Sequence, residues 1–136
     1  MRLIEMVKAA MLYVPLLRDN FSTESAGVDC NDFDGAMFVL QVGTIDIAVN
    51  LKIQESDDDS TYVDITGAAI TALGADDDNK FCVIDVNMTP GSRKRYLRAV
   101  LTVGDGTAGA DTAVLALLYK AGAKPTTSGA VEVVKV

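Results

Sequence analysis

The stretch TIDIAVNLKIQ, residues 44–54, alternates apolar and polar side chains without a break. A period of two is typical of a β-strand with one buried face, because successive side chains point to opposite sides of the backbone. The apolar positions that share the predicted buried face are Ile45, Ile47, Val49, Leu51 and Ile53. The preceding stretch AMFVLQV, residues 36–42, is apolar on both faces, and Gly43-Thr44 is the short link expected between the two strands.

Similar signals recur along the rest of the chain. Further strands are expected in TYVDI (61–65), FCVIDVNM (81–88), RYLRAVLTV (95–103), TAVLALLY (112–119) and GAVEVVKV (129–136). The second and third of these each present one apolar face. TAVLALLY is apolar on both faces, which indicates a central strand or one beneath a subunit contact. Turns rich in Asp, Gly and Ser separate the strands.

This pattern predicts an all-β protein, a β-sandwich or jelly roll of about 6–8 antiparallel strands. The 136 residues are expected to form a single domain. Residues 1–20 are expected to be an N-terminal arm or a short helix, and residues 125–136 a C-terminal arm or strand. A short helical turn is expected near residues 68–73, where alanines gather.

Composition argues against several kinds of function. The chain has no His, and it contains no nucleophile elbow, phosphate-binding loop or zinc-protease motif. We therefore expect no enzyme activity, no cofactor and no metal. A net charge of −7 argues against nucleic acid as a partner, because phosphate contacts need clustered Lys and Arg. Cys30 and Cys82 do not form a CxxC pair and are expected as free thiols in the core.

Two acidic turns, residues 57–59 and 76–78, each contain three consecutive aspartates. A calcium loop of the EF-hand type needs Gly at its sixth position and Glu at its twelfth, and neither turn meets this requirement. Asp also favours exposed turns, because its side chain accepts hydrogen bonds from nearby backbone N–H groups. We expect solvated turns, with a looser cation site formed by both turns together as the alternative.

The one basic cluster is RKRYLR, residues 93–98. At strand spacing, Arg93 and Arg95 would share one face, and Tyr96 and Arg98 the other. These residues are candidates for a contact with a partner protein. The alternative is that they form ion pairs with acidic residues of their own chain.

The apolar N-terminal run offers a second set of candidate contacts, Leu12, Tyr13 and Leu16. The run is too short to span a bilayer, so no membrane association is expected. Glu5 and Pro15 interrupt the pattern of a signal peptide. Packing on the domain or on a neighbouring subunit is the expected role.

Three stretches carry a resemblance to a known group of proteins. GAMFVLQVGTI (35–45), LKIQESDDDSTYVDI (51–65) and GSRKRYLRAVLTV (91–103) resemble small structural proteins from tailed-bacteriophage head gene clusters. That group includes capsid decoration (cement) proteins and other minor head proteins. One departure is Asp59, which stands where a turn glycine would be common.

The resemblance implies a virion protein, made in the host cytoplasm, that sits on the capsid surface and bridges capsomers. Its implied partners are the major capsid protein and further copies of itself, as a dimer or trimer. Two alternatives remain open: a head–tail connector or tail-terminator component, and a calcium-dependent β-sandwich binding module.

Overall fold

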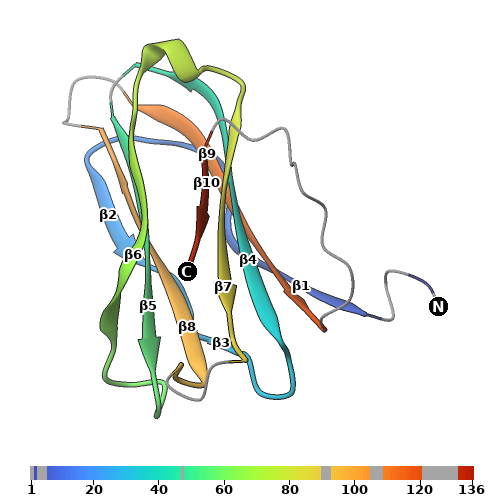
Figure 1. The fold of residues 1–136 in the computed structure, drawn as a ribbon. Helices are drawn as coiled ribbons and strands as arrows, with labels where there is room; N and C mark the ends of the chain where they lie inside the picture. Colours follow the sequence, from blue (N-terminus) through green and yellow to red (C-terminus); the bar gives the residue numbers. More distant parts are fainter. Residues whose placement is uncertain (1, 3–5, 47, 90–92, 105–108, 121–131) are drawn as a thin grey trace.

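Within residues 2, 6–46, 48–89, 93–104, 109–120 and 132–136, which the computed structural model describes, the chain forms ten strands and one short 3-10 helix (Figure 1). The strands are β1 (Val7–Arg18), β2 (Phe21–Glu24), β3 (Val28–Asp29), β4 (Gly35–Ile45), β5 (Val49–Ser56), β6 (Val63–Leu73), β7 (Phe81–Asn87), β8 (Tyr96–Val103), β9 (Ala110–Tyr119) and β10 (Glu132–Lys135). The helix η2 spans Ala75–Asp77. The β-sandwich prediction is confirmed, with more strands than the sequence indicated.

Two sheets pack face to face (Figure 1). Sheet A has the strand order β1-β9-β4-β7-β10, and sheet B has the order β2-β8-β5-β6, with β3 also paired to β8. The recorded pairings are antiparallel except that of β10 with β7, which is parallel. The strand β10 also contacts β6, so it lies along one side of the sandwich where the two sheets meet.

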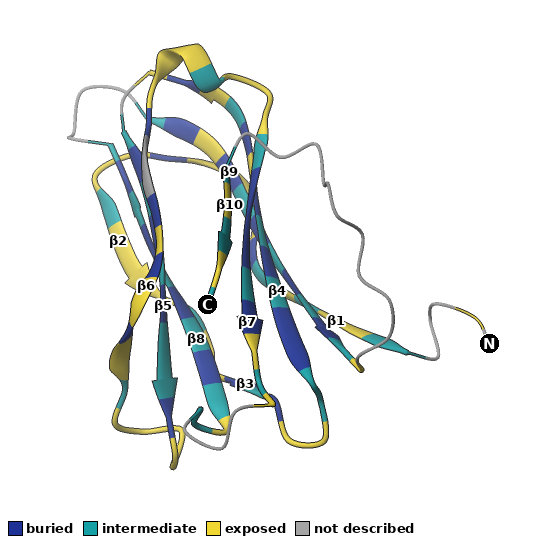
Figure 2. Ribbon diagram, in the orientation of Figure 1, coloured by how far each residue is buried: buried dark blue, intermediate teal, exposed yellow. Residues whose placement is uncertain are grey.

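The core lies between the two sheets, and the alternating strands supply it as predicted (Figure 2). The inward residues of β8 are fully buried: Leu97, Ala99, Leu101 and Val103. Cys82, Ile84 and Val86 of β7 are buried as well, with Met88 packed against them. Fully burying one such aliphatic side chain stabilises the fold by about 1.5–3 kcal/mol.

The break between β4 and β5 lies later than predicted. We expected the link at Gly43-Thr44, but β4 continues to Ile45 and β5 begins at Val49. Both Ile45 and Val49 are buried, because the chain crosses from sheet A to sheet B between them. The Asp78 carboxylate accepts a hydrogen bond from the Ile45 N–H at 2.7 Å and so satisfies the end of β4. Ile47 lies outside the described residues.

Three local predictions have different outcomes. Within residues 1–20, expected as an arm or a short helix, Val7–Arg18 form the strand β1, so the helix alternative is wrong for these residues. The predicted helical turn at residues 68–73 is wrong too, because β6 runs through it and the helical turn comes later, at Ala75–Asp77. Within residues 125–136, expected as an arm or strand, Glu132–Lys135 form the strand β10, while residues 121–131 lie outside the described part.

Candidate interaction surface

The acidic turn at residues 57–59 satisfies its own hydrogen bonds. The Asp58 carboxylate accepts hydrogen bonds from the backbone N–H groups of Thr61 at 2.9 Å and Ser60 at 3.0 Å, and from the Ser56 hydroxyl at 2.8 Å. These bonds lower the pKa of Asp58, that from Thr61 contributing most. Asp59 has φ of 58°, the left-handed conformation that a glycine would adopt, and it accepts a hydrogen bond from the Tyr62 hydroxyl. Asp59 therefore adopts the backbone conformation that a glycine at this position of the turn would favour.

The two acidic turns do not meet. They lie at opposite ends of the sandwich, separated by the length of β6 (Figure 1). An eleven-residue strand extends over roughly 35 Å. A cation site that combines the two turns is therefore ruled out. Within the part of the chain that the structure describes, no group of three or more Cys, Asp or Glu side chains is placed to hold a metal ion.

The basic cluster is paired within the chain. Arg93 lies 3.2 Å from the Glu55 carboxylate. Arg95 donates two hydrogen bonds of 2.8 Å to the Asp29 carboxylate, and these bonds lower the pKa of Asp29 to about 2. Arg93 and Arg95 precede β8, which begins at Tyr96. The prediction that they share one face of a strand therefore does not apply.

Arg98 and Tyr96 lie on the outer face of sheet B. The Arg98 guanidinium stacks 4.1 Å from the centre of the Tyr62 ring and donates a hydrogen bond to Gln54 at 2.8 Å. The Tyr96 ring lies beneath Arg95, at 5.1 Å. Arg93 and Arg95 thus pair with carboxylates of their own chain, whereas Arg98 contacts the neutral side chains of Tyr62 and Gln54.

The three apolar candidates of the N-terminal run differ in exposure. Tyr13 is buried, and the single proton of its hydroxyl is shared between the carbonyl groups of Thr23 and Ala99, so this side chain joins the two sheets. Leu12 is half-buried against the core. Leu16 is 57% exposed. Of the three, Leu16 alone presents most of its surface to a partner, and Tyr13 presents almost none.

Sequence reasoning did not identify an apolar row on the outer face of sheet A. Five apolar residues, one from each strand, lie side by side across the whole sheet. This apolar row consists of Met11 (β1), Leu115 (β9), Val39 (β4), Val83 (β7) and Val133 (β10). Met11 is 64% and Val133 42% exposed at its two ends; between them Leu115 and Val39 are partly exposed and Val83 is buried. The neighbouring row begins with the apolar residues Ala9, Leu117 and Met37 and ends with the charged residues Asp85 and Lys135.

The outer face of sheet B differs in chemistry. Its central strands direct Asn50, Lys52 and Gln54 of β5 and Arg98 and Thr102 of β8 outward. The two faces of the sandwich are therefore unequal, one polar and one largely apolar. The signal for this was present in the sequence, since AMFVLQV and TAVLALLY are apolar on both faces. Both strands proved to be central in the same sheet, which puts their second apolar faces side by side.

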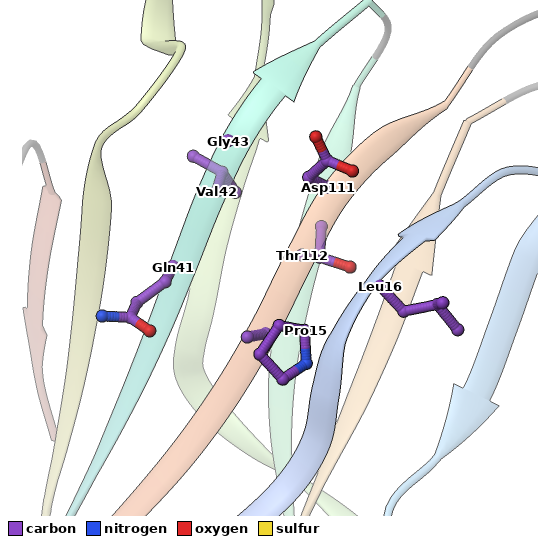
Figure 3. Close-up of a pocket in the computed structure, with 8 residues that line it drawn as sticks. Pro15, Leu16, Gln41, Val42, Gly43, Asp111 and Thr112 are labelled. Atoms are coloured by element: carbon purple, nitrogen blue, oxygen red, sulfur yellow. The ribbon is translucent and has the colours of Figure 1, made fainter.

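A shallow hollow lies beside the apolar row (Figure 3). Its lining includes Pro15 and Leu16 of β1, Gln41 and Gly43 of β4, and Asp111 of β9. Figure 3 shows these side chains around the outer face of three neighbouring strands. The hollow is open and mixed in polarity, so it suits a protein side chain better than an enclosed small molecule.

The two cysteines are free and buried, as predicted. Burial raises the pKa of the Cys30 thiol to about 12 and that of the Cys82 thiol to about 11. Thiols of this kind are poor nucleophiles at neutral pH, because the thiolate is the reactive form. Among the described residues, no helix is long and apolar enough to cross a membrane.

No family model matches the sequence, and no curated protein matches it. The PBSX exported protein XepA shares the fold with a TM-score of 0.58 at 17% identity, over 89% of this chain and 39% of that chain. A Bacillus endospore appendage protein of disulfide-linked pili has a TM-score of 0.50 at 11% identity, over 86% of this chain and 90% of that chain. A third structure, of infectious bursal disease virus, has a TM-score of only 0.35 at 17% identity and carries no argument. At these identities the likeness establishes the fold alone.

Proposed function

We propose that this chain is a structural virion protein that binds the outside of a bacteriophage capsid and stabilises it by bridging capsomers. The observation that carries the proposal is the apolar row across the outer face of sheet A, on a chain whose net charge is −7. The resemblance of residues 35–45, 51–65 and 91–103 to phage head proteins supplies the identity of the partner, the major capsid protein. The role is mechanical and involves no catalysis.

The outer face of sheet A suits docking on a flat protein surface. An apolar band that crosses five strands is unusual on a surface exposed to water, and such bands commonly mark interaction sites. Many copies bound by symmetry to one shell act together, so modest contacts in each copy add up to strong retention. A protein that binds the assembled shell and not its separated subunits stabilises the shell by mass action.

The contacts proposed here differ from those that the sequence first indicated. Arg93, Arg95 and Arg98 are paired within the chain and are now expected to hold β8 and its neighbouring loops in place. Leu16 stays a candidate contact because it is exposed and lines the hollow beside the apolar row, whereas Leu12 packs against the core. The buried thiols argue against the disulfide linkage named for the endospore appendage, because neither Cys30 nor Cys82 is accessible to a second chain.

The decisive experiment is to measure the copy number of this protein in purified particles, by quantitative mass spectrometry against the major capsid protein. A ratio comparable with that of the capsid protein supports the decoration role. A copy number equal to a single ring per particle would instead support a connector or tail-terminator component. Absence from particles would overturn the virion proposal.

A variant tests the surface itself. Leu115→Gln puts a polar group of similar size in the middle of the apolar row, and Val100→Gln is a matched control in the middle of the outer face of sheet B. Since Leu115 is already partly buried, we expect a loss of about 1 kcal/mol per copy, or about fivefold in affinity for shells that lack the protein. Equal binding of both variants would contradict the assignment of the surface.

A further inference from the structure

The strand β1 leaves one side of sheet A open to pairing. It pairs with β9 along one edge, and no described strand pairs along the other. An unpaired edge presents a row of backbone N–H and C=O groups, and only another extended backbone matches that row. The opposite edge of sheet A is less open, because β10 has only four residues and contacts β6 of sheet B.

Most of the large apolar side chains that are exposed in the described part of the chain lie on β1. Four large apolar side chains on this strand are more than half exposed: Met11, Val14, Leu16 and Leu17. Natural edge strands are usually protected by charges, Pro or bulges. Pro15 and the bulges that follow Met11 protect the second half of β1 in this way. Residues 7–11 keep a regular register with β9 and carry a single charge, that of Lys8.

Charge identifies the partner that this edge can accept. Two copies that each carry a net charge of −7 repel one another over most of their surfaces. The strand β1 contains no Asp or Glu, whereas the other described edge strands β2, β6 and β10 contain Glu24, Asp64 and Glu132. The first half of β1 is therefore the strand edge at which two copies approach with the least repulsion.

We infer that a second copy of this chain pairs with β1, antiparallel and about a twofold axis at Ala9, so that two A sheets join into one continuous sheet. This arrangement places Val7 opposite Met11 of the second copy and Lys8 opposite Ala10 of the second copy. No charge then faces a like charge across the pair, and the small exposed Ala9 meets its own copy at the axis. The pairing uses the five residues whose register with β9 is regular.

In this arrangement the outer faces of the two A sheets lie on the same side of the joined sheet. Opposed residues in an antiparallel pair share a face, so the outward residues Val7, Ala9 and Met11 meet outward residues of the second copy. The row of Ala9, Leu117 and Met37 is thereby continued across the axis by the same row of the second copy, while each Met11 lies opposite Val7 of the other copy. The dimer goes beyond the proposed function and does not depend on it, because the two chains would pair whether or not a shell is present.

The test is sedimentation velocity of the full chain, from micromolar to near-millimolar concentration. We expect the wild type to pass from monomer to dimer over this range. Ala9→Lys and Ala9→Glu each place like charges opposite one another at the axis, so each variant alone is expected to remain monomeric. An equimolar mixture of the two variants is expected to restore the dimer, because Lys then faces Glu.

Matched controls are Ala69→Lys and Ala69→Glu, which change an exposed alanine on β6, an edge strand of sheet B. These controls should dimerise like the wild type, and all variants should melt cooperatively, which shows that they fold. A wild type that stays monomeric throughout would overturn the inference, as would dimers that persist in both Ala9 variants or a mixture that stays monomeric. None of these results bears on the Leu115→Gln test of shell binding, so the two proposals fail separately.

Discussion

The hydroxyl of Tyr13 joins the two sheets, and removing it tests the packing at the β1 side of the sandwich. The Tyr13→Phe substitution deletes one oxygen and leaves the ring in place. That ring packs edge-to-face on Phe21, at 6.1 Å between centres, and it lies beneath the Arg18 guanidinium at 5.5 Å. Both contacts persist in the variant. The difference in stability therefore reports on the hydrogen bonds of the hydroxyl to the carbonyl groups of Thr23 and Ala99.

The expected loss follows from the donors that the two carbonyl groups retain. The Ala99 carbonyl keeps the Ser25 N–H at 2.8 Å, and Thr23 stays paired with Leu101 in the β2–β8 ladder, so neither carbonyl is left without a donor. A hydrogen bond contributes about 1 kcal/mol net. We expect Tyr13→Phe to lower the free energy of unfolding by about 1 kcal/mol. For a chain of 136 residues this corresponds to a melting temperature lower by about 3–4 °C.

The assay is urea-induced and thermal unfolding followed by circular dichroism. Tyr96→Phe is the matched control, because the Tyr96 ring is half-buried on β8 and its stacking with Arg95 survives the substitution. The control should change the free energy of unfolding by less than about 0.5 kcal/mol. If Tyr13→Phe has no larger effect than Tyr96→Phe, then the hydroxyl does not stabilise the contact between the sheets and the reasoning is refuted.

The pH dependence of the free energy of unfolding gives a second, independent test of the Tyr13 hydroxyl. Burial raises the pKa of Tyr13 above its ordinary value, so the folded state favours the neutral hydroxyl. This contribution to stability is fully present below pH of about 10 and is lost as the pH rises through the raised pKa of the folded state. The difference in unfolding free energy between wild type and Tyr13→Phe should therefore shrink at strongly alkaline pH.

Three further predictions concern other sites. Gly35→Ala should destabilise the fold by about 1–3 kcal/mol in thermal unfolding, because a Cβ there would lie 2.2 Å from the Tyr119 ring. At Asp59, whose φ is positive, Asp59→Ala should be less stable than Asp59→Gly by about 1 kcal/mol in urea unfolding; equal stabilities would contradict the left-handed turn. The Cys30 and Cys82 thiols, with their pKa raised to about 12 and about 11, should react with a disulfide reagent only after denaturant is added, and their contribution to stability should decline as the pH rises from about 8.5 through those values.

Most of the correct predictions about the fold came from the two-residue alternation of apolar and polar side chains. For β7 and β8, each of which buries one face, the inward residues such as Leu97 and Leu101 were predicted correctly. The period failed for β1, because bulges after Met11 and at Leu16 break the alternation and Pro15 resembles a strand break. Only the pairing with β9, which lies about a hundred residues away in the sequence, identifies such a segment as a strand.

The contact residues were predicted less accurately than the strands, because their partners in the fold are distant in the sequence. Arg95 meets Asp29 across 66 positions, and the Tyr13 hydroxyl meets Ala99 across 86. Nothing in the local sequence distinguishes an arginine that binds its own chain from one that binds a neighbour. The apolar outer face of sheet A is similar, since two strands with two apolar faces become one surface only once the topology makes them neighbours.

Met11 is the residue at which the two proposed interactions meet. It begins the apolar row and also lies within the five residues of the proposed β1 pairing. A Met11→Lys substitution would introduce a charge into both surfaces, so we expect it to weaken dimerisation and shell binding together. Ala9→Lys should weaken dimerisation most, and Leu115→Gln should weaken shell binding alone. If Met11→Lys impaired only one of the two processes, then the pairing edge of β1 and the outer face of sheet A would be separate surfaces, and the assignment of Met11 to both would be wrong.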